Sequence, residues 1–369
     1  MSEHKGVSLQ DHIGRWQAVA KAKPIRDNAA VGRKQSVHAT LADMLTTAIE
    51  LEFATIPLYL CALWSIKDDL HPVAKSLREI VQEEMLHMGL TCNMLAAIGY
   101  QPPIRRLAPT YPSGLPGDVH PGLTVHLQGL NKDSLRTFLQ IESPAKLAAS
   151  VPVEEGDLTW PEVRTIGQFY ECVMAAFEAY AADGGIFHVA NQVSASLVWR
   201  VIGSPEDAKT AIRIITTQGE GATVKSGPAG SPRDSGREDY AHYYRFLEVW
   251  KEKRLVRLDK RGARTERYEW RDGYKLPDCH PMGLVPNVGF PDAPPEVMQL
   301  LNDFDETYHD MLDLLESAWL PGGQGQLVHA IAKMFELERY AKPLMAISRL
   351  DDPKLTYGPL FSRPKEQTP

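Results

Sequence analysis

The most constraining feature of the sequence is a carboxylate and an imidazole within the apolar stripe of a predicted helix. At the helical period, Glu84 and His87 fall on the same stripe as Ile80 and Leu95. The two polar residues are three positions apart, so their side chains project from one face, one turn apart. Buried charge is costly unless it is paired or binds a metal ion. Glu-x-x-His pairs that face the interior of a bundle are ligands in di-metal carboxylate proteins.

A second Glu-x-x-His pair, Glu306 and His309, shows why the surrounding pattern matters. Its helix has an apolar stripe that includes Phe304, and the pair lies on the opposite, polar face with Asn302. We therefore interpret this pair as a solvated surface pair. Glu84, by contrast, lies inside an apolar stripe and is the candidate ligand.

Size and composition exclude several classes of protein. The 369 residues are 43% hydrophobic, enough for a sizeable core, but no apolar run appears long enough to span a bilayer. The polar N-terminus lacks the apolar segment of a signal peptide. A net charge of −7 with interspersed signs argues against nucleic acid as a partner. Four cysteines without Cys-x-x-Cys spacing indicate reduced thiols in a cytoplasmic protein. Without a spanning run, no membrane partner is expected.

The first helix of the predicted bundle begins at about Val37 and carries another inward carboxylate. Glu52 interrupts an apolar stripe that includes Leu45, although a partly exposed position is an alternative interpretation. Pro57 removes one backbone hydrogen bond and is expected to kink this helix. The connection at residues 68–72 is short, which predicts an antiparallel hairpin with the following helix.

The third predicted helix, about Pro161–Ala182, offers two carboxylates. Its apolar side includes Tyr170 and Phe177, and Glu171 and Glu178 lie on a flank beside it. Either carboxylate could reach inward, and periodicity does not choose between them.

The fourth helix is predicted to be interrupted. One piece covers about Pro205–Gly219, a Gly/Pro/Ser-rich loop follows, and a helix resumes at Asp239. If the two pieces form one bundle helix, Glu220 and His242 lie near each other. Asp239 is a rival carboxylate, three residues before His242, and a core-edge imidazole among tyrosines is the alternative interpretation of His242.

The predicted organisation is one helical bundle with additions. We expect an N-terminal arm at residues 1–36 and a metal-binding bundle with inserted loops at 37–252. A cap segment with C-terminal helices packed on the bundle follows at 253–350, and a tail at 351–369. The two C-terminal helices are predicted at about Pro294–Leu320 and Gln326–Ile347, outside the four-helix core.

Together the inward groups form the ligand set of a di-metal carboxylate bundle. Its members are Glu52, Glu84 with His87, Glu171 or Glu178, and Glu220 with His242. Two divalent cations about 3.5–4 Å apart would neutralise four carboxylates, which could not all stay ionised in a dry core. Carboxylate oxygens with imidazole nitrogens suit iron or manganese.

An ordered set of motifs resembles a known family. The motifs are AIELEFATIP (48–57), EEMLH (83–87), PTYP (109–112), FLQIESP (138–144), TIGQFYE (165–171), QGEG (218–221) and HYYRF (242–246). They resemble the ferritin-like domain of iminophenyl-pyruvate dimer synthases, used in violacein-type biosynthesis, over most of residues 38–350. The resemblance implies a ferritin-like fold. With the residue patterns above, we predict an all-α, ferritin-like four-helix bundle with an interrupted fourth helix, extra C-terminal helices and Pro/Gly-rich insertions. The resemblance favours Glu171 over Glu178 and Glu220 over Asp239.

The resemblance also implies oxidative chemistry on an amino-acid-derived amine or imine. We therefore predict a non-haem di-iron oxidoreductase, an oxidase or oxygenase that uses O₂ or peroxide on a small-molecule substrate in secondary metabolism. The predicted iron ligands are Glu52, Glu84, His87, Glu171, Glu220 and His242. One alternative is a ferroxidase-like or metal-storage protein, and another is a haem-dependent imine-coupling synthase. The sequence does not identify the substrate, the metal in the cell or the oligomeric state. A homo-oligomer is one option for the last.

Overall fold

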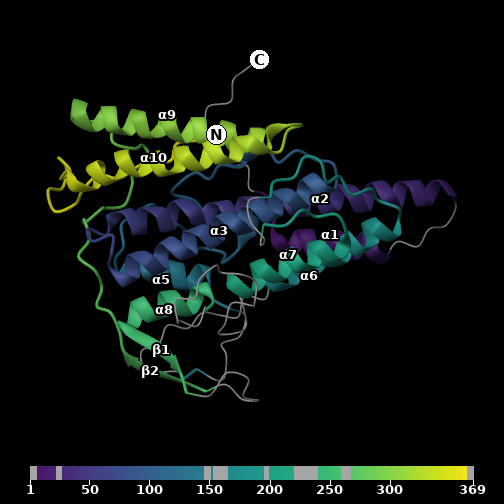
Figure 1. The fold of residues 1–369 in the computed structure, drawn as a ribbon, viewed down its shortest axis with the longest axis horizontal. Helices are drawn as coiled ribbons and strands as arrows, with labels where there is room; N and C mark the ends of the chain where they lie inside the picture. Colours follow the sequence, from purple (N-terminus) through teal and green to yellow (C-terminus); the bar gives the residue numbers. More distant parts are fainter. Residues whose placement is uncertain are drawn as a thin grey trace.

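A long helical hairpin forms the centre of the molecule. A computed structural model describes residues 6–21, 27–144, 151–152, 165–194, 199–219, 240–258 and 267–363. Helices α2 (Asp27–Ser65) and α3 (Pro72–Ala97) pack side by side across a short turn (Figure 1). The His71 side chain accepts a hydrogen bond from the Val73 backbone N–H and so caps α3, which satisfies a donor that the first turn leaves unpaired. The predicted antiparallel hairpin is confirmed.

Helix α2 is longer and more apolar than the sequence led us to expect. It begins at Asp27 rather than Val37, and it continues past Pro57 to Ser65. By length and composition alone, its Lys34–Ser65 part could cross a membrane, which corrects the expectation that no segment would qualify. However, 89% of the apolar window is buried inside the protein. Burial by neighbouring parts of the chain accounts for the apolar surface of this helix as part of the core.

Shorter helices complete the bundle in two pairs. Helix α6 (Thr165–Ala182) packs on α7 (Pro205–Gln218), and α5 (Lys132–Ile141) packs on α8 (His242–Lys251). The α6–α7 pair lies against α2 and α3, and α8 also contacts α3 (Figure 1). The fourth bundle helix therefore consists of α7 and α8, two pieces as predicted. Helix α5 is also part of the bundle, because it packs on α8.

Local sequence determines where these short helices begin. At α5 the Asn131 side chain accepts a hydrogen bond from the Ser134 backbone N–H, and the Ser134 hydroxyl accepts one from the Asn131 backbone. At α7 the Ser204 hydroxyl accepts a hydrogen bond from the Asp207 backbone N–H. Both arrangements satisfy donors that a first helical turn leaves unpaired. As α5 ends at Ile141, the next residue, a glutamate, becomes its C-cap.

The remaining elements surround the bundle. They are α1 (Leu9–Lys21), α4 (Ile104–Leu107), η1 (Pro116–Asp118), the antiparallel strands β1 (Lys253–Arg257) and β2 (Tyr268–Asp272), α9 (Pro295–Ala318), η2 (Gly323–Gly325) and α10 (Gln326–Ala346). Helices α9 and α10 form a second hairpin beside α2, close to their predicted bounds (Figure 1). The all-α bundle with an interrupted fourth helix and extra C-terminal helices is confirmed, whereas the proposed division into four segments stays a prediction.

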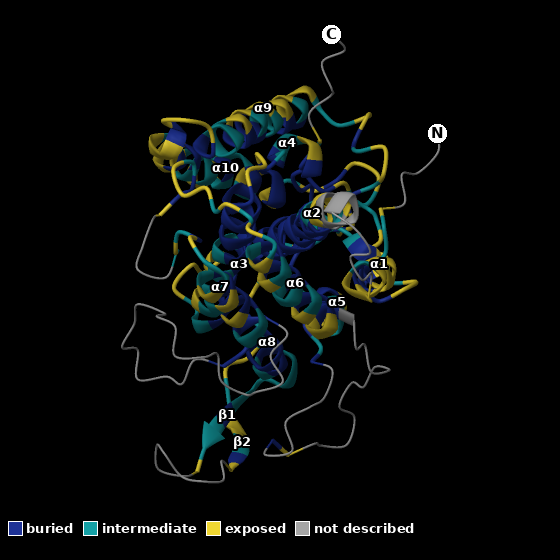
Figure 2. Ribbon diagram, turned by 90° about the vertical axis from the view of Figure 1, so that its right-hand side faces the viewer, coloured by how far each residue is buried: buried dark blue, intermediate teal, exposed yellow. Residues whose placement is uncertain are grey.

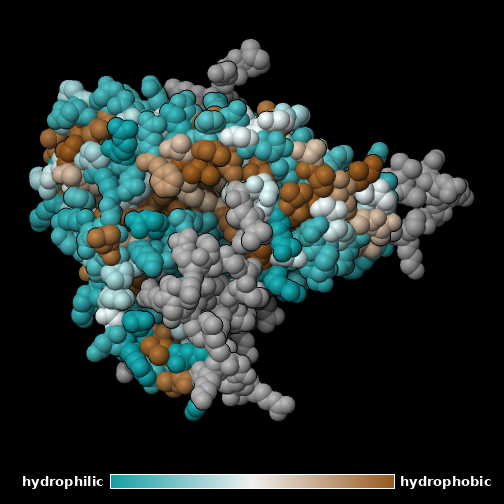
Figure 3. Space-filling model, in the orientation of Figure 1, coloured by the Kyte–Doolittle hydropathy of each residue, from teal (hydrophilic) through white to brown (hydrophobic). Residues whose placement is uncertain are grey.

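Burial is concentrated in the central hairpin. Figure 2 shows α2 and α3 as buried, while α1, α9 and α10 expose their outer faces. The face in Figure 3 is largely hydrophilic, with apolar residues gathered in a band across its middle. Polar side chains buried in the central hairpin are therefore exceptional, and Glu52, Glu84 and His87 are three of them.

Candidate metal centre

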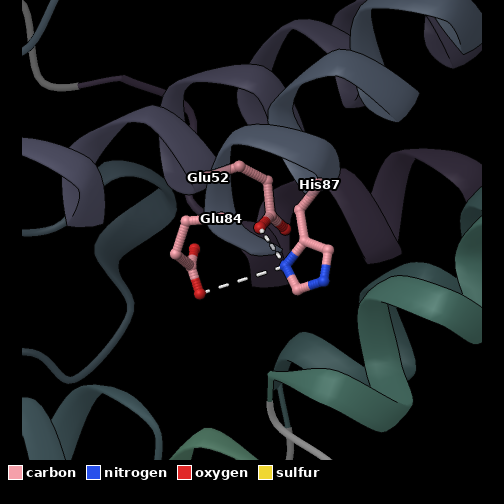
Figure 4. Close-up of side chains that lie close together, drawn as sticks. All are labelled: Glu52, Glu84 and His87. Carbon is pink, nitrogen blue, oxygen red and sulfur yellow. Dashed lines mark ion pairs between the residues drawn. The ribbon is translucent and has the colours of Figure 1, made fainter. Parts of the chain in front are cut away.

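Helices α2 and α3 bring three of the predicted ligands together. The exposed fractions of Glu52, Glu84 and His87 are 7%, 3% and 1%. The Nδ1 atom of His87 lies 3.5 Å from Glu52 Oε2 and 3.9 Å from Glu84 Oε1 (Figure 4). All three side chains point toward one another, and their donor atoms are close enough to hold one metal ion.

A second group shares Glu84 with the first. The Nδ1 atom of His242, in the first turn of α8, lies 2.8 Å from Glu84 Oε1 and 3.6 Å from Glu142 Oε2. His242 and Glu142 are both buried. Donor atoms of Glu84, Glu142 and His242 could hold a second ion, with the Glu84 carboxylate between the two positions.

The structure brings some of the predicted site residues together but not all of them. Glu52, Glu84, His87 and His242 come together. Glu220 lies outside the described residues, as does its rival Asp239, so that choice stays a prediction. The expectation that Glu171 faces the bundle interior is wrong, because its side chain is exposed.

The geometry of α6 explains the error at Glu171. This helix turns Tyr170, Val173 and Phe177 into the core. One residue further along a helix is rotated by about 100°, so the neighbour of an inward tyrosine points away. Glu178, the other candidate, follows the inward Phe177 and is exposed for the same reason.

Glu142 is the site residue that sequence reasoning missed. It follows α5, whose buried face includes Leu135 and Phe138. Glu142 is seven and four residues beyond these two, which places it on the same stripe. The spacing that identifies Glu142 was thus present in the sequence. In a short helix, however, a single glutamate after an apolar stripe is indistinguishable from an ordinary helix end.

Each histidine donates a hydrogen bond through its Nε2 atom, the ring nitrogen that points away from the cluster. His87 Nε2 lies 2.9 Å from Gln218 Oε1, and His242 Nε2 lies 2.8 Å from Glu83 Oε2. Carboxylate and amide oxygens only accept hydrogen bonds, so both Nε2 atoms carry the proton. In the neutral imidazoles, the lone pairs are then on the Nδ1 atoms and face the carboxylate cluster, as they do in histidines that bind metal through one nitrogen and donate through the other.

The closest contact in the cluster tests whether the residues fit a metal. His242 Nδ1 is buried without a well-oriented hydrogen-bond partner among the described residues, although Glu84 Oε1 is only 2.8 Å away. Two acceptors at that distance repel each other unless a cation or a shared proton lies between them. Carboxylate oxygens with imidazole nitrogens are donors that iron and manganese prefer. The residues fit such an ion.

The pKa values show how the cluster behaves without metal. Burial raises the pKa of Glu84, and the nearby Glu142 carboxylate raises it further. Burial lowers the pKa of His242, but the charge of Glu142 and the contacts with Glu142, Glu83 and Glu84 outweigh burial, so the net pKa is well above the usual value. The metal-free cluster therefore retains protons, and metal binding would release them.

The carboxylates are held by hydroxyl groups. The Tyr170 hydroxyl donates to Glu52 Oε1 at 2.5 Å, and the Tyr59 hydroxyl donates to Glu142 Oε1 at 2.6 Å. Thr55 Oγ1 lies 2.8 Å from Glu84 Oε2. Each glutamate thus has one oxygen in a hydrogen bond and the other oriented toward a histidine.

An ion pair fixes the His242 side of the cluster. Arg245 Nη1 lies 2.7 Å from Glu83 Oε2, and Arg245 Nη2 donates to the Ser76 carbonyl at 2.7 Å. Burial raises the pKa of Glu83, but Arg245 and the hydrogen bond from His242 outweigh it and lower the pKa to about 2. Glu83 therefore stays ionised and orients His242.

A small cavity adjoins the cluster. Its lining includes Glu52, Glu84, His87 and Glu142 together with apolar residues such as Ile166. It offers about 40 Å³ to water-sized molecules. Since one water needs roughly 10–15 Å³ by this measure, the cavity has room for a few small molecules.

The structure predicts opposite outcomes for two glutamates. Glu142→Gln removes a charged donor beside His242, so bound iron should fall from about two ions per chain to about one. Glu171→Gln changes an exposed side chain and should leave the iron content unchanged. Metal analysis of both variants checks this, and equal iron loss would restore Glu171 as a ligand.

Comparison with known proteins agrees with this geometry. Residues 45–251, more than half of the chain, match the family described as ferritin-like. The crystal structure of a ferritin-like protein from Caulobacter vibrioides is similar with a TM-score of 0.54 and 21% identity, covering 87% of this chain and 97% of that one, a likeness of fold. No curated protein sequence matches the chain. The matched segment contains Glu52, Glu84, His87, Glu142 and His242. The chain belongs to the ferritin-like family.

Proposed function

We propose that this protein is an iron-dependent oxidoreductase with a non-haem di-iron centre that uses O₂ or peroxide. The observation that carries the proposal is the pair of buried ligand groups that share Glu84. One ion would be held by Glu52, Glu84 and His87, and the other by Glu84, Glu142 and His242. Membership of the ferritin-like family, which includes di-iron enzymes, supports this assignment.

The bound iron would supply the redox chemistry, and this chain's residues would control its surroundings. Tyr170, Tyr59 and Thr55 orient the carboxylates through their hydrogen bonds. Apolar side chains in the cavity lining limit the water that reaches the centre. Glu83 and Gln218 hold the two histidines with Nδ1 directed at the carboxylates that would bind the ions with them.

For the substrate we propose an amino-acid-derived amine or imine, oxidised in a biosynthetic reaction. The support is the resemblance to iminophenyl-pyruvate dimer synthases. The cavity bounded by the described residues has room for O₂ or peroxide but not for an amino acid. That volume favours one alternative, a ferroxidase-like centre that oxidises iron without an organic substrate.

We also propose a cytoplasmic location and no membrane or nucleic-acid partner. All four cysteines are free. Reduced thiols are typical of proteins in reducing compartments. Net charge of −7 disfavours binding to nucleic acid. Assembly into a homo-oligomer is a further proposal, tested by sedimentation.

The test is anaerobic loading with Fe(II), followed by exposure to O₂ with and without candidate amines, imines and amino acids. Two irons per chain and O₂ uptake that depends on an organic compound would support the proposal. Two irons with O₂ uptake that stops once iron is oxidised would establish the ferroxidase alternative. Fewer than two irons would overturn the di-iron assignment, and an intense Soret band in the purified protein would establish the haem alternative.

A further inference from the structure

The two halves of the cluster are alike in their bonding. In the first half, Glu52 gives Oε1 to the Tyr170 hydroxyl and turns Oε2 toward His87. In the second, Glu142 gives Oε1 to the Tyr59 hydroxyl and turns Oε2 toward His242. A carboxylate that uses one oxygen for a strong hydrogen bond has a single oxygen left for a metal.

The halves differ in what surrounds them. Glu52, His87 and Tyr170 all line the cavity, so an ion in the first half would adjoin open space. Of the second half, Glu142 also lines the cavity, but neither His242 nor Tyr59 is among the described residues that do. The Tyr59 ring instead packs against Phe138 at 4.8 Å and Phe246 at 5.0 Å between ring centroids.

The aromatic rings fill the space beside the second half. Tyr59, Phe138 and Phe246 are buried, and the rings of Phe138 and Phe246 also contact each other, with centroids 5.2 Å apart. Close-packed rings leave no room for a ligand without a large rearrangement. On its Nε2 side, His242 contacts Glu83, which is already bonded to Arg245.

We propose that the first half of the centre is the one that binds a small exogenous ligand, and that Tyr170 is the positioning residue that keeps its coordination position open. This rests on the proposed di-iron function and deepens it. The Tyr170 hydrogen bond holds Glu52 Oε1 away from the ion. Without the phenol, Oε1 would be free to turn to the ion as well, and a glutamate that binds through both oxygens would compete with a small ligand from the cavity.

Azide is a suitable probe, because it is a small anion that gives a visible charge-transfer band when it binds ferric iron. The protein is loaded with iron, oxidised in air and titrated with azide. The wild-type protein should bind one azide per pair of irons. Two equivalent azides per centre would overturn the assignment without any variant.

Matched variants isolate the role of Tyr170. Tyr170→Phe and Tyr59→Phe each remove one hydroxyl that donates to a terminal carboxylate. Tyr170→Phe should keep about two irons and weaken azide binding by about tenfold or more, which corresponds to at least about 1.4 kcal/mol. Tyr59→Phe should change the azide affinity by less than about twofold, since its half faces packed rings.

The outcomes separate this inference from the proposed function. Equal weakening in both variants, or none in Tyr170→Phe at full iron content, would overturn the assignment of the open position while the di-iron centre stands. A wild-type protein that holds fewer than two irons would overturn both. If Tyr170→Phe loses iron, the number of azide ions bound by the wild-type protein tests the assignment. One azide per pair of irons supports it, and two equivalent azides overturn it.

Discussion

Glu84→Gln is expected to remove both metal ions. Glu84 Oε1 lies 2.8 Å from His242 Nδ1 and 3.9 Å from His87 Nδ1, so this one carboxylate belongs to both ligand groups. Glutamine has the same shape but no charge, and neutral amides are poor ligands for iron. Iron content should fall from about two ions per chain to nearly none, whereas loss of a terminal ligand should cost about one ion.

The same substitution should stabilise the metal-free protein. Burial and the Glu142 charge raise the folded-state pKa of Glu84, so its ionised form is disfavoured by folding. The stability linked to a raised pKa is present below the unfolded pKa and is lost as pH rises through the folded pKa. At neutral pH, metal-free Glu84→Gln should therefore unfold at a higher temperature than metal-free wild type.

Glu306→Gln is the matched control for both measurements. Glu306 belongs to the other Glu-x-x-His pair and is exposed, while His309 bonds to the Ser362 carbonyl at 2.8 Å. Its substitution should leave iron content unchanged and alter stability by about 0.5 kcal/mol or less. Retention of one full ion in Glu84→Gln would show that Glu84 is not shared.

The central part of the site was predictable because its polar residues interrupt otherwise apolar stripes. Glu52 and Glu84 lie in long helices, where many neighbours define the buried face. His242 was found because the two pieces of the fourth helix were recognised as one. In each case periodicity over several turns, or continuity of an element, carried the inference.

The positions of the other site residues depend on how the helices pack together, which the periodicity of a single helix does not determine. Glu171 and Glu178 each follow an inward aromatic residue, and only the rotation of α6 in the bundle shows that both point outward. Glu142 ends a short helix whose place beside α8 is a tertiary fact. The resemblance included the segment around Glu142 but attached no role to it. Short elements have too few turns to define which neighbour they will face.

Arg245→Met is expected to destabilise the protein by about 3 kcal/mol at neutral pH, because it leaves the Glu83 carboxylate buried without its cation. The lowered pKa of Glu83, about 2 against an ordinary 4.5, determines the pH dependence. A lowered folded-state pKa contributes stability that is present above the unfolded pKa and lost as pH falls through the folded one. The difference between wild type and variant should therefore shrink between about pH 4.5 and pH 2.

Arg271→Met is the control that separates the effect on stability of losing this buried ion pair from the effect of losing an arginine elsewhere. Arg271 bonds to Glu269 on β2, where both side chains are exposed, so the same substitution should cost about 0.5 kcal/mol or less. Denaturant unfolding of the metal-free proteins at several pH values measures both variants. A cost for Arg245→Met that matches Arg271→Met would contradict the role of the ion pair. A large cost that does not change with pH would show that Arg245 acts through its bond to the Ser76 carbonyl instead of the Glu83 charge.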